Sequence, residues 1–379
     1  MAMREFSQLL PPTTFVPKIK TILFKPHTAS SRGWETSATL SLYLLLYVAM
    51  EFATLLPPNL ASVISASPPH LIDQAIKTAF LHLDHDIIQT GADAALGPRF
   101  FADAFAQLSG GYAGSCALLS LYDRTSKLLR VACTGDSRAV LGRRNVVTGK
   151  WEAIPLSVDQ TGYNETEAAR IRAEHPDEPD PVQNGRVLGM AVTRAFGDGR
   201  WKWPREVQEK AKSRFYGPRL LEGFRTPPYL TAEPVITTTK ISPENRDFVI
   251  MASDGLWDQL SSEQAVDLVG RWLESHDPEM PPKPQHSLGL LSASPQPDVL
   301  KRTKPEEGKA YTNQRFAKEE NFVVVDENAA THLARNALGG GDEDLLRGAM
   351  MMQAPFARNV RSVLGWRFRF FHPLFIPTF

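Results

Sequence analysis

The chain has 379 residues, and its 42 Lys and Arg balance 42 Asp and Glu, so the formal net charge is zero. Hydrophobic residues make up 42% of it and charged residues 22%. These proportions exclude a disordered tail protein, a collagen and a protein drawn to nucleic acid by bulk positive charge. The length allows one large or two average domains, whose core needs no disulfides. Its two cysteines, Cys116 and Cys133, lie in apolar runs, which favours buried, reduced thiols.

Residues 1–32 form a basic N-terminal arm in which Glu5 is the single acid. This composition is compatible with an organelle transit segment and equally with a loose arm; no secretory signal is evident. The apolar run at 40–50 is closed by Glu51 and a Pro-Pro pair. It is too short to span a bilayer, so we expect a buried helix there and no membrane span.

Next along the chain, apolar residues recur every three or four positions over 71–87, which predicts a core-facing helix. Two β-prone runs at 115–122 and 127–134 flank a polar turn and predict an antiparallel hairpin, with a third strand at 139–144. Asn164, followed three residues later by Glu167, indicates a helix start with a reciprocal cap.

The second half of the chain predicts a strand at 247–252, a strand-to-helix corner at 253–258 and a helix capped by Ser261 and Gln264. Residues 275–320 are rich in Pro, Lys, Glu, Gln and Ser, which is typical of an exposed insertion. A helix-like stretch at 328–338 follows it.

Three loops place an aspartate beside glycine: 134–138, 194–199 and 253–258. They carry Asp136, Asp198, Asp254 and Asp258. A strand holds its last residue in place and glycine permits a tight turn, so the carboxylates can share a crevice that suits a hard divalent cation. Without a His or Cys cluster, Mg²⁺ or Mn²⁺ is favoured over zinc. Taken singly, each of these aspartates is better explained as a turn residue that binds backbone N–H groups; three such loops together shift the balance towards the metal site.

Four ordered segments, 114–117, 134–139, 193–198 and 252–258, resemble the metal-dependent protein serine/threonine phosphatases of type 2C. The segments 157–164, 175–176, 200–203 and 229–234 more specifically resemble the mitochondrial pyruvate dehydrogenase phosphatase branch of that family. The resemblance implies an α+β fold: a β-sandwich of two antiparallel sheets flanked by helices, here with incomplete N- and C-terminal strands. It divides the chain into the arm at 1–32, a core at 33–274, the Pro-rich insertion at 275–320, the end of the core at 321–358 and a tail at 359–379 that lies outside the family pattern.

The resemblance also implies metal-dependent hydrolysis of phosphoserine and phosphothreonine in proteins, by water that two Mg²⁺ or Mn²⁺ ions activate. Asp254 would ligate the catalytic pair, Asp136 and Asp258 would belong to a further metal position or its surroundings, and Asp198 is a further candidate of that kind. Arg138 and Arg194 would brace the loops. The substrate would be a phosphoprotein, with the pyruvate dehydrogenase component of its complex as the specific candidate. The compartment would be the mitochondrial matrix, or otherwise the cytoplasm; nucleic acid is not expected as a partner.

The family pattern breaks at both ends of the match. The Asp-Gly-His-x-Gly run expected just before residue 33 is replaced by Ala-Ser-Ser-Arg at 29–32, and no counterpart of the strand with the phosphate-binding arginine precedes residue 25. No carboxylate side chain follows Asp344, so the terminal metal aspartate is missing too. No catalytic residue is therefore identifiable, and we expect weak or no turnover.

Two explanations of these breaks stay open. One is a pseudophosphatase that binds phosphoproteins or partners without hydrolysing them. The other is a defective gene model, in which intron or out-of-frame sequence stands in place of the true ends. A functional alternative is a partner-binding scaffold whose contact surface contains Trp201, Trp203 and the insertion, provided that these are exposed. Otherwise the two tryptophans pack in a flap beside the cleft.

Overall fold

The computed structural model describes residues 19–27, 69–97, 100–278, 280, 317–352 and 366–370. For 19–27 and 366–370 the description is of the backbone. The α-helices are α2 (Ile72–Leu96), α3 (Phe101–Tyr112), α4 (Glu165–Glu174), α5 (Arg205–Phe215), α6 (Asp254–Trp257), α7 (Ser262–His276), α8 (Ala329–Ala337) and α9 (Glu343–Met351). Short 3₁₀ helices lie at Pro69–Leu71, Gly199–Trp201, Pro243–Asn245 and Glu319–Asn321.

The strands form two larger antiparallel sheets and one small hairpin. The first sheet has the order β1-β2-β3-β9, from β1 (Ile19–His27), β2 (Gly114–Asp123), β3 (Leu128–Thr134) and β9 (Val235–Lys240), and the short β8 (Phe196–Gly197) pairs with the start of β2. The second has the order β11-β10-β4-β5, from β11 (Trp366–Phe370), β10 (Phe248–Ala252), β4 (Arg138–Arg144) and β5 (Trp151–Pro155). The hairpin consists of β6 (Val182–Gln183) and β7 (Arg186–Val187).

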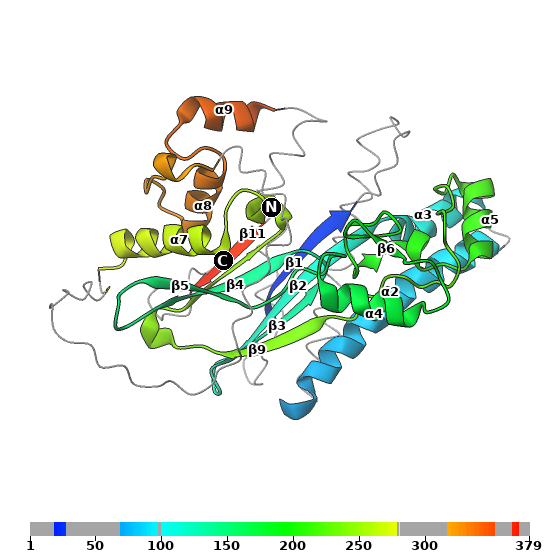
Figure 1. Ribbon diagram of the computed structural model, residues 1–379, viewed down its shortest axis with the longest axis horizontal. Coiled ribbons are helices and arrows are strands. Elements are labelled where there is room, and N and C mark those ends of the chain that lie inside the picture. Colours follow the sequence, from blue (N-terminus) through cyan, green and yellow to red (C-terminus); the bar gives the residue numbers. More distant parts are fainter. Residues whose placement is uncertain are drawn as a thin grey trace.

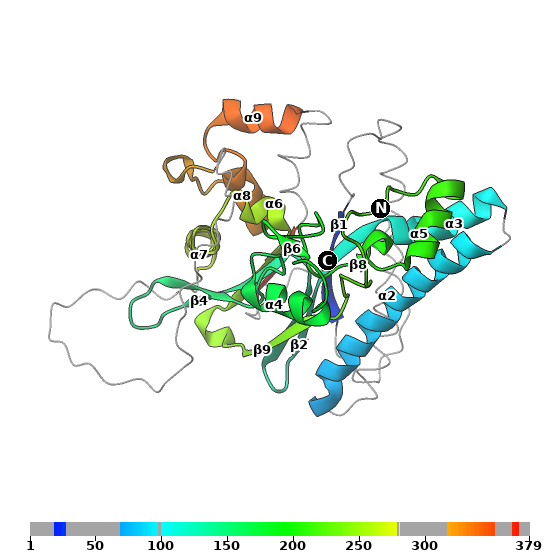
Figure 2. The ribbon, with the colours of Figure 1, turned by 45° about the vertical axis from the view of Figure 1, so that its right-hand side comes forward.

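The two sheets are the inner layers of a four-layer arrangement, and helices form the outer layers (Figure 1). A buried cluster joins the sheets, with Leu118 and Val131 from the first and Leu141 and Val249 from the second. α2 covers the outer face of the first sheet, and α7 and α8 cover the second. Figure 2 shows these helix layers on opposite sides of the strands. β2 is covered on both faces, which is why its first eight residues are all buried, including the small polar Ser115 and Ser120.

The predicted α+β sandwich is confirmed, with β2 and β3 as the expected hairpin and α7 behind the expected capping box. The helix predicted over 71–87 is longer and reaches Leu96. The strand predicted at 139–144 is present but leaves the hairpin's sheet for the second one, beside β10. The arm and the tail each supply a strand, β1 and β11, to a sheet edge. The helix expected at 40–50 and residues 281–316 of the insertion lie outside the described residues.

Candidate functional site

The four ordered motif segments meet at one end of the sandwich. Arg138 pairs with Ala252 across β4 and β10, so the turn that contains Asp136 lies beside the corner that contains Asp254. Thr134 at the end of β3 pairs with Ala117 of β2, and β8 pairs with the first two residues of β2. Antiparallel pairing therefore brings together loops that are far apart in the sequence.

The Asp136 turn is tightly packed against Cys116. The Cys116 Sγ donates to Asp136 Oδ1 at 3.3 Å, and the Asp136 N–H donates to the same sulfur at 3.4 Å. Gly135 has φ of +105°, and a Cβ there would lie 2.0 Å from the sulfur, so glycine is required on both counts. Cys116 and Cys133 are both buried thiols, as predicted, and burial raises the pKa of the Cys133 thiol well above its ordinary value.

Gln160 clamps the same turn, which the sequence did not reveal. Its side-chain oxygen accepts the Gly135 N–H at 2.6 Å, its amide donates to the Cys133 carbonyl at 3.0 Å, and its own N–H donates to the Gly135 carbonyl at 3.0 Å. The side chain is buried. The one sequence signal of this role is that Gln160 lies in the 157–164 segment that carries the resemblance.

Arg138 braces the two aspartate loops, as predicted. It makes two hydrogen bonds to Asp159, at 2.9 and 2.6 Å, and its guanidinium lies 5.4 Å from the ring centroid of Trp257. Trp257 closes α6, which begins with the half-buried Asp254 and is followed by the exposed Asp258. The guanidinium thus links the corner at 253–258 to Asp159, whose neighbour Gln160 supports the Asp136 turn.

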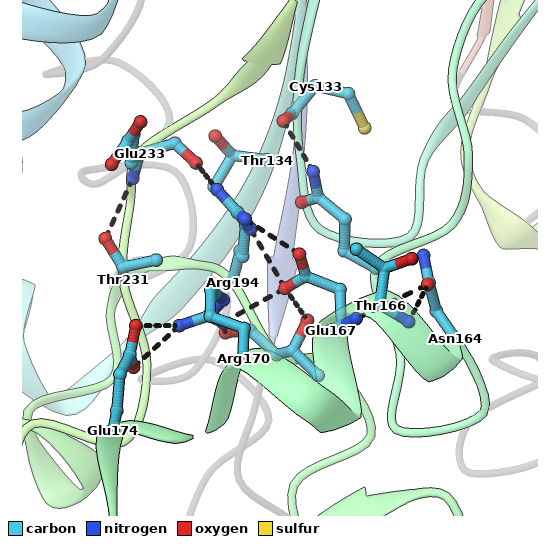
Figure 3. Close-up of polar contacts among 12 residues, drawn as sticks. Cys133, Thr134, Asn164, Thr166, Glu167, Arg170, Glu174, Arg194, Thr231 and Glu233 are labelled. Carbon is cyan, nitrogen blue, oxygen red and sulfur yellow. Dashed lines mark hydrogen bonds and ion pairs between the residues drawn. The ribbon is translucent and has the colours of Figure 1, made fainter. Parts of the chain in front are cut away.

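Arg194 is the centre of a second brace, drawn in Figure 3. It donates to both Glu167 oxygens, at 2.9 and 2.7 Å, and to the Glu233 carbonyl at 2.7 Å. Thr193 and Arg170 also donate to Glu167, at 2.7 and 3.0 Å. Burial alone would raise the pKa of Glu167, but the hydrogen bonds and charge of Arg194 outweigh it and lower that pKa to about 2.

This use of Glu167 corrects the reciprocal cap predicted for α4. Asn164 does accept from the N–H groups of Thr166 and Glu167, at 3.1 and 3.4 Å. The Glu167 side chain, however, is taken up by Arg194, because a guanidinium offers a charged, two-pronged partner where the helix start offers one N–H. The predicted bracing role of Arg194 is confirmed, and Glu167 is the partner that sequence reasoning missed.

Asp198 lies beside a buried ion pair. Lys202 donates to both oxygens of Asp84, at 2.7 and 2.6 Å, and to the Ala195 carbonyl at 2.7 Å. Asp198 is 2% exposed, and its Oδ2 has no hydrogen-bond partner among the described residues. A Cβ at Gly114 would lie 1.9 Å from that oxygen, so the carboxyl is packed against the start of β2. Burial raises its pKa to about 7; Lys202 lowers it and Asp84 raises it further.

Trp201 and Trp203 are buried, 4% and 1% exposed. Their indole N–H groups donate to the carbonyls of Val187 and Ile88, at 3.2 and 2.8 Å. They are therefore not the exposed contact surface of the scaffold interpretation, because both are packed inside the protein.

The described residues do not complete a metal centre. Within the described ranges, no three His, Cys, Asp or Glu side chains are grouped so that they could hold an ion. Asp136 and Asp254 have the oxygen chemistry that Mg²⁺ and Mn²⁺ prefer, and Mg²⁺ commonly binds through one or two carboxylates while water completes its coordination. The two aspartates of the described ranges thus fit one such ion, whereas a two-metal centre would need further protein ligands. None of the helices in it is long and apolar enough to cross a bilayer.

The chain matches the family described as protein phosphatase 2C over residues 50–286. It is 38% identical to a protein phosphatase 2C homolog of Schizosaccharomyces pombe, over 87% of this chain and 69% of that protein. It is 37% identical to the mitochondrial [pyruvate dehydrogenase [acetyl-transferring]]-phosphatase 1 of Saccharomyces cerevisiae, over 89% of this chain and 60% of that one. It is 33% identical to the mitochondrial [pyruvate dehydrogenase [acetyl-transferring]]-phosphatase 2 of Homo sapiens, over 75% of this chain and 52% of that protein. The chain thus spans about half to two thirds of the length of these relatives.

Proposed function

Since the chain belongs to the protein phosphatase 2C family, we propose that it hydrolyses phosphoserine and phosphothreonine in proteins with the help of Mg²⁺ or Mn²⁺. The observation that carries the proposal is the convergence of four ordered motif segments on one end of the sandwich. Phosphoryl transfer to water requires chiefly that charged groups be held in position. The braces of Arg138, Gln160 and Arg194 supply that rigidity to the loops.

Asp254 and Asp136 are the carboxylates that we propose as metal ligands, because their loops are adjacent and rest on these braces. Asp258, which is exposed at the end of α6, is proposed to belong to a further metal position or to its surroundings. Asp198 is not retained as a ligand, because its carboxyl packs against Gly114 beside the Asp84–Lys202 pair.

The proposed substrate is the pyruvate dehydrogenase component of its complex, and the proposed compartment is the mitochondrial matrix. Both proposals are supported by relatives whose names give that activity and that organelle. The basic arm at 1–32 is compatible with import.

The activity is tested by phosphate release from a phosphoserine peptide in the presence of Mn²⁺. We expect Asp254→Asn to abolish whatever release the chain shows, because the amide removes a charged oxygen donor from the metal. Asp267→Asn is the matched control, since that aspartate has a half-exposed side chain on α7 and forms an ion pair with its helix neighbour Arg271. Release that persists unchanged in Asp254→Asn would contradict the assignment of Asp254.

A second candidate function is a pseudophosphatase that binds phosphoproteins without turnover. It is favoured by the lack of any three-ligand group in the described ranges. Calorimetry with Mn²⁺ separates the two functions. Heat of binding that Asp254→Asn removes supports the enzyme, whereas no uptake together with no phosphate release supports the pseudophosphatase.

A further inference from the structure

An exposed group of apolar side chains caps the far end of the helical layer that covers the first sheet. Its members, here called the aromatic tip, are Leu96, Phe100, Phe101 and Tyr216, which are 46%, 85%, 48% and 69% exposed. They come from the end of α2, the start of α3 and the residue after α5, which Figure 1 places together at one end of the molecule. Exposed apolar side chains that gather on neighbouring elements mark interaction sites more often than singly scattered ones do.

Two rings of the aromatic tip, those of Phe101 and Tyr216, are packed against neighbouring rings and so are held in a fixed arrangement. The Phe101 ring lies 5.8 Å from that of Phe105, 5.7 Å from that of Phe215 and 5.9 Å from that of Tyr216. Phe215 is buried and anchors the group to the core. Pre-ordered aromatic side chains lose little conformational entropy on binding, which is the property that makes them energetic centres of protein interfaces.

One side of the aromatic tip is basic. Lys212 and Arg214 lie in the last turn of α5, both exposed, and the Arg214 guanidinium lies 5.1 Å from the Phe215 ring centroid. No described acidic side chain forms an ion pair with Lys212 or Arg214. Two exposed acids lie on the other elements, Asp103 in the first turn of α3 and Asp93 three residues before Leu96 in α2. The α5 side of the surface therefore combines aromatic rings with two cations, and the acids lie on the α2 and α3 side.

We propose that the aromatic tip docks a partner protein that presents an apolar side chain within an acidic surface. A second copy of this chain is disfavoured, because a two-fold contact would bring the basic ends of two α5 helices together. A lipid surface is disfavoured because most of the rings are held by their neighbours and only Phe100 projects freely enough to insert. α3 runs for roughly 18 Å from the aromatic tip to the start of β2. A docked protein would therefore lie within reach of the aspartate loops, but its binding does not depend on their chemistry.

The test uses the full chain and, as probe, a fluorescein-labelled random copolymer of glutamate and tyrosine, with binding followed by fluorescence anisotropy at low salt. We expect Phe100→Ser and Lys212→Glu each to weaken binding about tenfold. Both side chains are exposed, so neither change should disturb folding. The matched controls are Val147→Ser and Lys150→Glu, equally exposed on the turn between β4 and β5 and expected to have no effect.

Four results would overturn the proposal. Binding of the copolymer that is unchanged in Phe100→Ser would remove the role of the rings. Polyglutamate that binds as tightly as the copolymer would reduce the site to charge attraction. Sedimentation with phosphatidylserine-containing vesicles, lost in Phe100→Ser, without copolymer binding would assign the aromatic tip to membranes. Self-association that Phe100→Ser removes would assign it to a second copy.

Discussion

The buried carboxyl of Asp198 makes the stability of the protein depend on pH in a direction opposite to that of an ordinary aspartate. Its pKa in the folded protein is about 7, against an ordinary value of 3.8, because burial disfavours the charged form. The folded protein therefore binds this proton more tightly than the unfolded chain does. The stability that results is fully present below the ordinary pKa and is lost as the pH rises to the folded value.

The change Asp198→Asn replaces the acid by an uncharged group of the same shape. The difference of about 3 pKa units corresponds to about 4 kcal/mol at 1.36 kcal/mol per unit. Most of it develops between pH 4 and about 7, so we expect the stability of Asp198→Asn relative to the original chain to rise by about 2–3 kcal/mol between pH 5 and pH 8. A native structure holds only about 5–15 kcal/mol in total, so the effect is large.

The assay is urea unfolding of both chains at a series of pH values, followed by tryptophan fluorescence. Trp201 is a suitable reporter, since its backbone N–H donates to the backbone carbonyl of Asp198 at 2.9 Å. Other titrating groups cancel in the difference between the chains. A difference that is flat from pH 5 to pH 8, or that falls, would refute the argument that this carboxyl is protonated by burial.

Three further changes test the Arg194 brace, the buried Asp84–Lys202 ion pair and the cap of α4. Glu167→Gln should cost about 3 kcal/mol at pH 7, because it leaves the buried Arg194 without its charged partner. In thermal unfolding, the difference in stability between Glu167→Gln and the original chain should shrink as the pH falls from about 4.5 towards 2, where Glu167 itself takes up a proton. A difference that stays constant over this range would contradict the argument. Lys202→Met should cost about 3–5 kcal/mol, since it leaves Asp84 buried and unpaired. The double change with Asp84→Leu should recover part of that loss, and a purely additive loss in denaturant unfolding would disprove the coupling. Asn164→Ala should cost about 1 kcal/mol through loss of the cap of α4, measured as a lower unfolding midpoint, whereas an unchanged midpoint would show that the cap contributes nothing.

Local features of the protein were determined by the sequence alone. The capping box of Ser261 and Gln264, the hairpin of β2 and β3 and the cap by Asn164 follow from contacts between residues a few positions apart. A single aspartate beside glycine has the ordinary turn as its explanation, so it is the recurrence of three such loops in order along the chain that makes them a candidate metal site.

Tertiary structure alone decided which of these residues share a role. Asp84 and Lys202 are 118 positions apart, and Glu167 and Arg194 are 27 apart, so no local pattern pairs them. The burial of Trp201 and Trp203 and the raised pKa of Asp198 likewise depend on elements distant in the chain. Sequence periodicity shows that a side chain faces a core, but the partner it meets there, and hence its charge and its chemistry, depends on how the layers pack.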